Sequence, residues 1–299
     1  MIYHVFANRS NIGDWLSAKG IQKSLYPHQV VECLCDKPFV NETIKILRKA
    51  TENDLIIIGG GGLLMDYFLP FWQKFQPITE KVPFCIWGIG YCDLKQENSK
   101  PPTGLIEEII IKSKLAVVRD ELTISYLSNC KLPPPVTCPS INIITPLQEK
   151  GDDILHVVNY STAGKQVYDK MCKAAQLFAQ QTGRTYREVN NRISKGSEPE
   201  MEETLKMYRK SEFVLSSALH GCIIALAMGL KVLAVSGDRK IDAFMQRVGL
   251  EDWVLDITET DLIPERLINL HLQKDVRQVM EQIRGENKNI AEQILQKIH

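Results

Sequence analysis

The amino-acid sequence predicts an α/β protein built from two doubly wound Rossmann-like domains that face each other across a cleft. Short apolar runs alternate with segments of helical period along most of the 299 residues. Several runs are rich in Ile and Val and apolar on both faces, which is typical of parallel strands covered by helices on each side. A proline-rich stretch interrupts the alternation near the middle of the chain.

The first domain is expected to span residues 1–135. Its apolar runs read IYHVF, QVVECL, LIII, FCIW and LAVV, and each is followed by a segment with apolar residues at helical spacing. The expected strands are 2–6, 29–34, 55–58, 84–87 and 115–118, and the expected helices are 15–25, 41–50, 68–76, 105–113 and 121–128.

Residues 131–146 contain five prolines, three of them consecutive. Proline runs are stiff and join neither a helix nor a central strand. Residues 136–150 are therefore interpreted as an interdomain linker. A long surface loop within one domain is the alternative.

The alternation resumes in the second domain, expected at 151–270. A polar loop is expected at 190–199, and 271–299 is assigned as a C-terminal helical segment that would pack back on the first domain. The expected strands are 154–159, 185–188, 213–216, 231–235 and 254–256, and the expected helices are 166–181, 200–210, 220–228, 240–248 and a long, interrupted 265–298.

Composition excludes several classes of function. Lys plus Arg and Asp plus Glu both number 36, so no broad positive field is available to gather nucleic acid. The longest apolar stretch, 222–230, is about half the ~20 residues of a membrane-spanning helix. The first residues lack a basic region and a cleavage site, so a cytoplasmic protein with at most peripheral membrane contact is expected. The eight cysteines lack zinc-site spacing, and no metal is expected.

Loops at the C-terminal ends of parallel strands build the binding sites of such sheets. Asn11, Gly13 and Asp14 follow the first expected strand and precede a helix. Glycine allows a tight turn, and Asp14 could accept a proton or cap the helix. Asn11 and Gly13 are assigned to substrate binding, and a pure capping role is the alternative.

Glycines follow the third and fourth expected strands. Gly60 and Gly61 lie in a run of four, and Gly90 closes a Gly-Ile-Gly segment. Leu64 and Asp93 stand where a dinucleotide fingerprint requires a third glycine. Both segments are interpreted as loops that let a ligand approach the backbone, and close packing without a ligand is the alternative.

Two basic residues stand at expected strand ends. Arg119 could grip a carboxylate or phosphate in a bidentate manner, and an Arg119–Asp120 surface pair is the alternative. Lys240 follows Ser-Gly-Asp between a strand and a helix, where it could contact a phosphate. A solvated lysine is the alternative reading there.

The most informative segment reads Ser-Ser-Ala-Leu-His-Gly, from Ser216 to Gly221. It closes a strand and opens an apolar helix, where free helix amides bind anions and lower the pKa of an imidazole. His220 is the candidate general acid, Asp14 a weaker candidate base, and Ser217 and Gly221 are candidates for substrate binding. A structural histidine is the alternative.

Together these motifs resemble the polysaccharide pyruvyl transferase family. The resemblance rests on the order of an N-x-G-D turn, a strand running into glycines, a G-x-G strand end, an Arg-Asp strand end and a Ser-x-x-Leu-His-Gly turn. The corresponding segments are 11–14, 56–64, 87–91, 118–127 and 215–231.

The resemblance implies a fold similar to the two-domain arrangement of GT-B glycosyltransferases. It also implies transfer of a pyruvyl group from phosphoenolpyruvate to a sugar, forming a pyruvate ketal on a cell-surface polysaccharide precursor carried by a lipid. Phosphoenolpyruvate is then a co-substrate, and no cofactor is expected. Ala218 stands where many members carry Arg, and Cys138-Pro139 replaces a common Asp-Pro pair. A nucleotide-sugar glycosyltransferase and a non-catalytic binding protein are the alternative functions.

Overall fold

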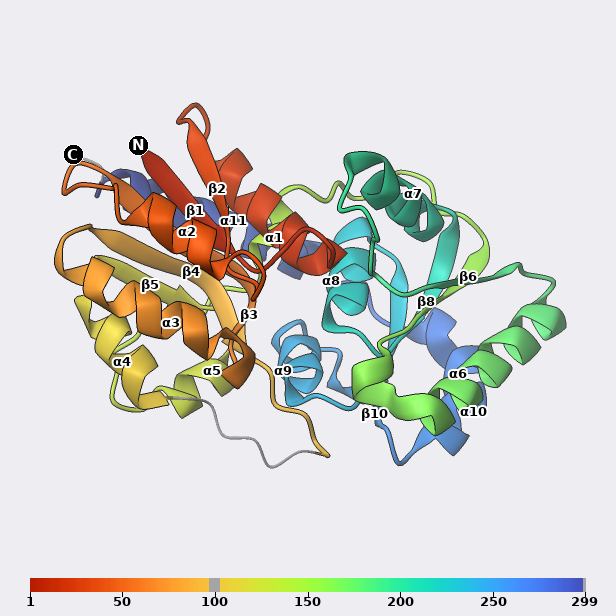
Figure 1. Cartoon of the computed structure of the whole chain (residues 1–299). Coiled ribbons are helices and arrows are strands. Elements are labelled where there is room, and N and C mark those ends of the chain that lie inside the picture. The colour runs from red at the N-terminus through yellow and green to blue at the C-terminus, as the bar shows by residue number, and fades with distance from the viewer. Residues whose placement is uncertain (97–102, 298–299) are drawn as a thin grey trace.

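The computed structural model describes residues 1–96 and 103–297, which form two parallel sheets of five strands each (Figure 1). The first sheet has the strand order β2-β1-β3-β4-β5 and the second β10-β9-β8-β6-β7. The strands are β1 (Ile2–Phe6), β2 (Val30–Leu34), β3 (Leu55–Leu64), β4 (Phe84–Tyr91), β5 (Leu115–Val118), β6 (Asp153–Val157), β7 (Tyr186–Val189), β8 (Ser211–Ser216), β9 (Lys231–Ser236) and β10 (Val254–Asp256). The predicted fold class is confirmed.

Helices cover the faces of both sheets. They are α1 (Ile12–Ser24), α2 (Val40–Leu47), α3 (Leu69–Phe75), α4 (Thr103–Lys112), α5 (Glu121–Tyr126), α6 (Tyr160–Thr182), α7 (Glu198–Arg209), α8 (Leu219–Met228), α9 (Arg239–Arg247), α10 (Ile263–Asn269) and α11 (Arg277–Leu295). The central strands are buried on both sides, which explains their unbroken Ile and Val runs.

The glycines expected in two loops lie inside strands. β3 continues through the four glycines, and Gly59 and Gly61 pair with Trp87 and Ile89 of β4. The positive φ of Gly60 (82°) and Gly61 (94°) accompanies a shift of register in this pairing. The loop prediction was therefore wrong, because glycine backbone can still pair as a strand while turning its direction locally.

The C-terminal segment returns to the first domain (Figure 1). The expected long helix is divided into α10 and α11, and residues 298–299 lie outside the described residues. The break brings the amide of Gln273 to the backbone of Val232, with hydrogen bonds of 2.9 and 2.7 Å. Beyond it, Ile290 and Ile294 pack with the core of the first sheet. Among the described residues, no helix combines the length and apolar character needed to cross a bilayer.

The segment between the domains is packed rather than free. The amide of Val136 donates to the oxygen of Val118, and a short 3₁₀ helix, Pro139–Asn142, follows. Cys138 and Ser140 of this segment are fully buried. The expected domain limits stay predictions, but the proline-rich stretch forms part of the interface between the sheets.

Two backbone bridges join the domains on either side of this interface. Asn11 pairs in antiparallel fashion with Arg192, in the segment where the sequence predicts a polar loop. Leu94, just after β4, pairs in the same way with Asp238, just after β9. The C-terminal strand ends of the two sheets are thereby held against each other, with the motif residues between them.

Candidate active site

The site lies where the first turn of α1 meets the first turn of α8. β1 and β3 flank the point at which the strand order of the first sheet reverses, and β6 and β8 flank the corresponding point of the second. Such points are where open α/β sheets bind ligands. α1 follows β1 and α8 follows β8, so Asp14 and His220 come from the two switch points.

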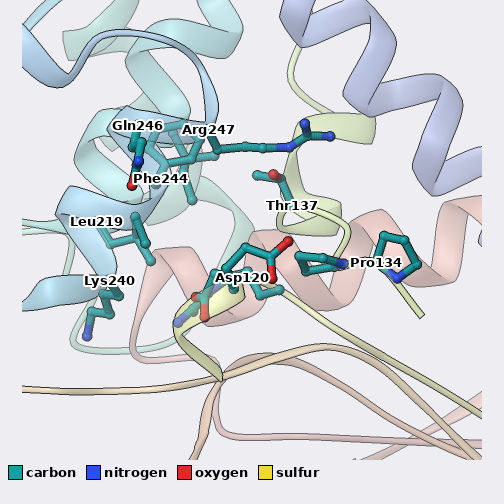
Figure 2. Close-up of a pocket in the computed structure, with 13 residues that line it drawn as sticks. Asp120, Pro134, Thr137, Leu219, Lys240, Phe244, Gln246 and Arg247 are labelled. Atoms are coloured by element: carbon teal, nitrogen blue, oxygen red, sulfur yellow. The ribbon is translucent and has the colours of Figure 1, made fainter. Parts of the chain in front are cut away.

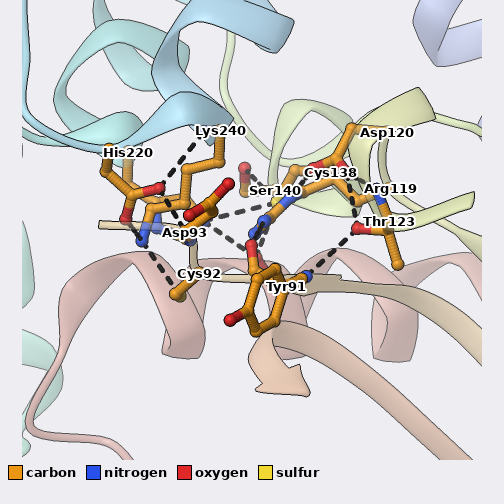
Figure 3. Close-up of polar contacts among 12 residues, drawn as sticks. Tyr91, Cys92, Asp93, Arg119, Asp120, Thr123, Cys138, Ser140, His220 and Lys240 are labelled. Carbon is orange, nitrogen blue, oxygen red and sulfur yellow. Dashed lines mark hydrogen bonds and ion pairs between the residues drawn. The ribbon is translucent and has the colours of Figure 1, made fainter. Parts of the chain in front are cut away.

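The imidazole of His220 packs against the first turn of α1 in the first domain. A Cβ at Gly13 would overlap with Nδ1 and Cγ of the imidazole. Nε2 lies 3.4 Å from Sγ of Cys138 (Figure 3). It also lies 3.4 Å from Oγ of Ser17. Desolvation, followed by the positive charges of Arg119 and Lys240, lowers the pKa of His220 to about 3. The imidazole is therefore neutral in the ligand-free protein at pH 7.

Asp14 supplies a carboxylate to the site from the first turn of α1. Burial raises its pKa to about 6, against the opposing charges of Lys240 and Arg119. Its Oδ1 fills the space in front of Gly61, where a Cβ would lie 2.5 Å away. Asn11, not Asp14, caps α1, because its Oδ1 accepts from the amide of Gly13 at 2.9 Å. The capping alternative for Asp14 is thus wrong.

Arg119 reaches the site from the end of β5. Its Nε donates to Oδ2 of Asp120 at 3.0 Å, and a terminal nitrogen donates to the oxygen of Tyr91 at 3.3 Å (Figure 3). Both side chains of the ion pair are buried, so the alternative of a surface pair is wrong. A Cβ at Gly90 would overlap with the guanidinium, which explains the glycine at this position.

Lys240 approaches from the second domain, at the start of α9. Its ammonium lies 2.6 Å from Oδ2 of Asp238 and 3.0 Å from Sγ of Cys92. Burial lowers the pKa of Lys240, but its neighbours Cys92 and Asp238 outweigh burial, and the net shift of the pKa is upward. The side chain is mostly buried, so the solvated-lysine reading is wrong. Each basic residue of the site is therefore charged and already paired with an aspartate.

A pocket of about 370 Å³ opens beside these basic residues, between α5, the interdomain segment, α8 and α9 (Figure 2). Arg119 and Lys240 contribute to its wall. Apolar side chains of Pro134, Leu219 and Phe244 form much of the rest. The pocket is thus lined by Arg119 from the first domain, by Lys240 and Arg247 from the second, and by apolar side chains.

Other predicted binding residues have structural partners. The backbone amide of Asn159 donates to Oγ of Ser217 at 2.9 Å, which ties the end of β6 to the start of α8. A Cβ at Gly60 would lie 2.7 Å from Cβ of Ser17, and one at Gly221 would overlap with Oγ of Ser216. Packing among the protein's own side chains explains why glycine stands at these positions, and contact of their amides with a substrate stays a prediction.

Sequence reasoning missed three polar residues of the site. They are Ser17, Cys92 and Cys138. The two cysteines received no role in the site because the cysteines of the chain show no zinc-site spacing. One signal was available for Cys138, since it stands where the resembling family carries Asp before Pro.

One group of potential metal ligands lies apart from this site. His156, Cys172 and Glu188 bring ligand atoms within 4.8 Å of one another on β6, α6 and β7. The hydroxyl of Tyr186 lies 3.1 Å from Nδ1 of His156, 3.4 Å from Sγ of Cys172 and 2.6 Å from Oε2 of Glu188. Tyr186 therefore links these groups by hydrogen bonds, while Nε2 of His156 is buried without a partner among the described residues.

The family model for polysaccharide pyruvyl transferase matches residues 11–239, well over half of the chain. The chain belongs to the polysaccharide pyruvyl transferase family. The matched region runs from the cap of α1 to the start of α9, and so contains His220, Asp14 and Arg119. Among curated proteins, none matches this chain in sequence.

Solved structures share the fold at low identity. UDP-GlcNAc 2-epimerase from Neisseria meningitidis, bound to UDP-GlcNAc, has a TM-score of 0.61 at 12% identity, with 99% of each chain covered. S. aureus MnaA with UDP has a TM-score of 0.57 at 11% identity, covering 93% of this chain and 90% of the other. The pneumococcal O-GlcNAc transferase GtfA, in complex with UDP and GlcNAc, has a TM-score of 0.52 at 12% identity. The match covers 87% of this chain and 59% of the other. These likenesses establish the GT-B-like arrangement of the family member described here.

Proposed function

We propose that this protein transfers a pyruvyl group from phosphoenolpyruvate to a sugar of a polysaccharide precursor, forming a pyruvate ketal. The observation that carries the proposal is the direct contact of two family motifs from different domains. The N-x-G-D turn and the Leu-His-Gly turn meet at Gly13 and His220. Arg119 and Lys240 act on the same imidazole electrostatically.

Phosphoenolpyruvate carries a carboxylate and a phosphate, and the site offers donors for both. Arg119 and Lys240 come from opposite domains and line one pocket. α8 begins at Ala218 without a side-chain cap, which leaves the amides of its first turn for an anion. Because each cation is already paired with an aspartate, a bound anion would share these cations rather than meet them free.

The proton transfers follow from the two perturbed groups. A sugar hydroxyl adds to C2 of phosphoenolpyruvate while its proton passes to the Asp14 carboxylate, and C3 takes a proton from His220. Phosphate then leaves with the proton held by Asp14, and a second hydroxyl closes the ketal on the oxocarbenium-like carbon while its proton passes to the His220 imidazole. His220 is neutral in the ligand-free protein, so it can act as acid only after the charge of bound phosphoenolpyruvate has raised its pKa. The positive charges of Arg119 and Lys240 would stabilise the departing phosphate.

The test is release of inorganic phosphate from phosphoenolpyruvate in the presence of sugar acceptors, with ketal formation followed by mass spectrometry and NMR. His220→Ala is expected to lower the rate by about 10² to 10⁴ while the melting temperature stays near that of the native protein. Full activity in this variant would remove His220 from the chemistry.

A nucleotide-sugar enzyme is the second candidate, because the structural neighbours hold UDP or UDP-GlcNAc. Asp238 and Lys240 would have to contact such a donor. A non-catalytic binding protein is the third, supported by Ala218 where many members carry Arg. Thermal-shift measurements separate the three: the melting temperature would rise with phosphoenolpyruvate, with UDP, or with neither.

We further propose a cytoplasmic protein that needs no cofactor and meets lipid-linked acceptors through peripheral contact with the membrane.

A further inference from the structure

Cys138 lies at the centre of a chain of polar contacts that ends at His220. Its Sγ is 2.7 Å from Oγ of Ser17, 3.2 Å from Oγ of Ser140 and 3.4 Å from Nε2 of His220. Cys138, Ser17 and Ser140 are fully buried. Each of the four groups can give or receive a proton, so the direction of the chain follows from the donors that remain available.

The hydroxyl of Ser17 has another acceptor for its proton. It donates to the oxygen of Gly13, one turn earlier in α1, at 2.9 Å. An oxygen that has given its only proton can act only as an acceptor. The proton in the close contact between Ser17 and Cys138 therefore comes from the thiol of Cys138.

A thiol that donates to Ser17 leaves its sulfur as an acceptor for the two remaining neighbours. Ser140 can fill one position with its hydroxyl proton, and His220 the other with a proton on Nε2. In the opposite arrangement, Ser17 would donate to Cys138 and the thiol of Cys138 would donate to an unprotonated Nε2. Ser17 would then lose its hydrogen bond to the oxygen of Gly13. We propose that Cys138 is a positioning residue that fixes His220 as the Nε2–H tautomer, so that protons enter and leave the ring at Nδ1.

The position of Nδ1 agrees with this role. It faces Gly13 in the first turn of α1, next to Asp14 in the sequence. It makes no hydrogen bond to the described residues, yet it is not among their buried polar atoms that lack a partner, and His220 is partly exposed. Nδ1 therefore keeps access to solvent. The step from this tautomer to an acid that protonates C3 through Nδ1 rests on the proposed function.

Long-range ¹H–¹⁵N correlation spectra of the ring nitrogens at pH 7 test the tautomer in the ligand-free protein. The signals that disappear in His220→Asn identify the ring. We expect Nε2 at a protonated, pyrrole-like shift and Nδ1 at an unprotonated, pyridine-like shift. The Nδ1–H form, or an equal mixture, would overturn the proposal. No substrate is present, so this outcome is independent of whether phosphoenolpyruvate is used.

Variants separate positioning from packing. Cys138→Ala leaves Oγ of Ser17, 3.4 Å from Nε2, as the remaining acceptor near this nitrogen and is expected to shift the spectrum from a single form toward a mixture of tautomers. Cys138→Ser, which keeps a donor and an acceptor, is expected to restore the single form. Cys85→Ala removes another fully buried thiol, from β4, and is expected to leave the ring signals unchanged. A Cys138→Ala protein that keeps the pure Nε2–H form would show that Cys138 does not fix it. If Cys138→Ala does not fold, the spectra of Cys138→Ser and of the native protein still show which tautomer His220 adopts.

Discussion

Gly13 and His220 form a contact between the two domains that only a glycine permits. A Cβ at position 13 would overlap with the ring of His220. Gly13 lies inside α1, and its backbone is not in the left-handed region that favours glycine. The glycine of the N-x-G-D turn is therefore explained by the imidazole that rests on it rather than by the turn itself.

Gly13→Ala is expected to displace the imidazole or the start of α1. Overpacking of this kind costs roughly 1–3 kcal/mol in the free energy of unfolding, and misplacement of a reacting group by about 1 Å can cost ~100-fold in rate. Denaturant unfolding and the rate of phosphate release measure the two effects.

Gly285→Ala is the matched control. This glycine lies within α11, and a Cβ there meets nothing within 4 Å. Alanine should raise the free energy of unfolding by up to about 1 kcal/mol and leave the rate unchanged. Native rate and stability in Gly13→Ala would contradict the contact.

Asp14→Asn is expected to make the protein more stable at neutral pH. The pKa of Asp14 is raised from 3.8 to about 6, so the folded state binds its proton more tightly than the unfolded state does. The resulting stabilisation is full below about pH 4 and is lost as the pH rises through 6. Allowing for partial exposure, the variant should gain roughly 1–2 kcal/mol at pH 7 and nothing at pH 4.

Denaturant unfolding between pH 4 and 8 measures this difference. Asp54→Asn is the control of opposite sign, because the amino terminus and the Thr51 amide lower the pKa of Asp54. That variant should lose stability as the pH rises above the pKa of a free aspartate. A pH-independent effect of Asp14→Asn would show that the Asp14 carboxyl titrates normally.

Binding of phosphoenolpyruvate is expected to draw a proton from solvent onto His220. The pKa of His220 is lowered to about 3 partly by Arg119 and Lys240, and a bound anion would oppose these charges. Calorimetric titrations in buffers of different ionisation enthalpy at pH 6 measure the uptake. Uptake should fall in His220→Asn. Equal uptake in both proteins would assign the proton to another group, of which Asp14 is the nearest candidate.

The sequence predicted the fold well because its strongest signals are local. Each expected strand is present, since Ile and Val runs such as 55–58 report burial on both faces directly. The end of β3 could not be predicted, because glycine reads as a loop until the partner strand is known. The break between α10 and α11 could not be predicted for a similar reason, because it depends on a hydrogen bond between Gln273 and Val232, which are distant in the sequence.

The candidate site could be predicted only as far as strand ends identify it. Asp14, Arg119 and His220 carry chemistry that stands out beside a strand end. Cys138 and Ser17 do not, because each is an ordinary residue until the other domain lies against it. The roles of the glycines were misread for the same reason: what fills the space at Gly61 or Gly90 is a side chain distant in the sequence.

Variants of the buried ion pair Arg119–Asp120 separate an effect on stability from an effect on binding of phosphoenolpyruvate. Both are buried, and Asp120 also accepts from the amide of Thr123 at 2.8 Å as the cap of α5. Arg119→Met would leave a buried carboxylate without its partner, at a cost of about 3–5 kcal/mol in the free energy of unfolding. The double variant Arg119→Met/Asp120→Asn removes both charges and keeps a capping side chain, so most of that loss should be recovered. Phosphoenolpyruvate should raise the melting temperature of the native protein but of neither variant. A double variant that is stable and still responds to phosphoenolpyruvate would exclude Arg119 from the anion site.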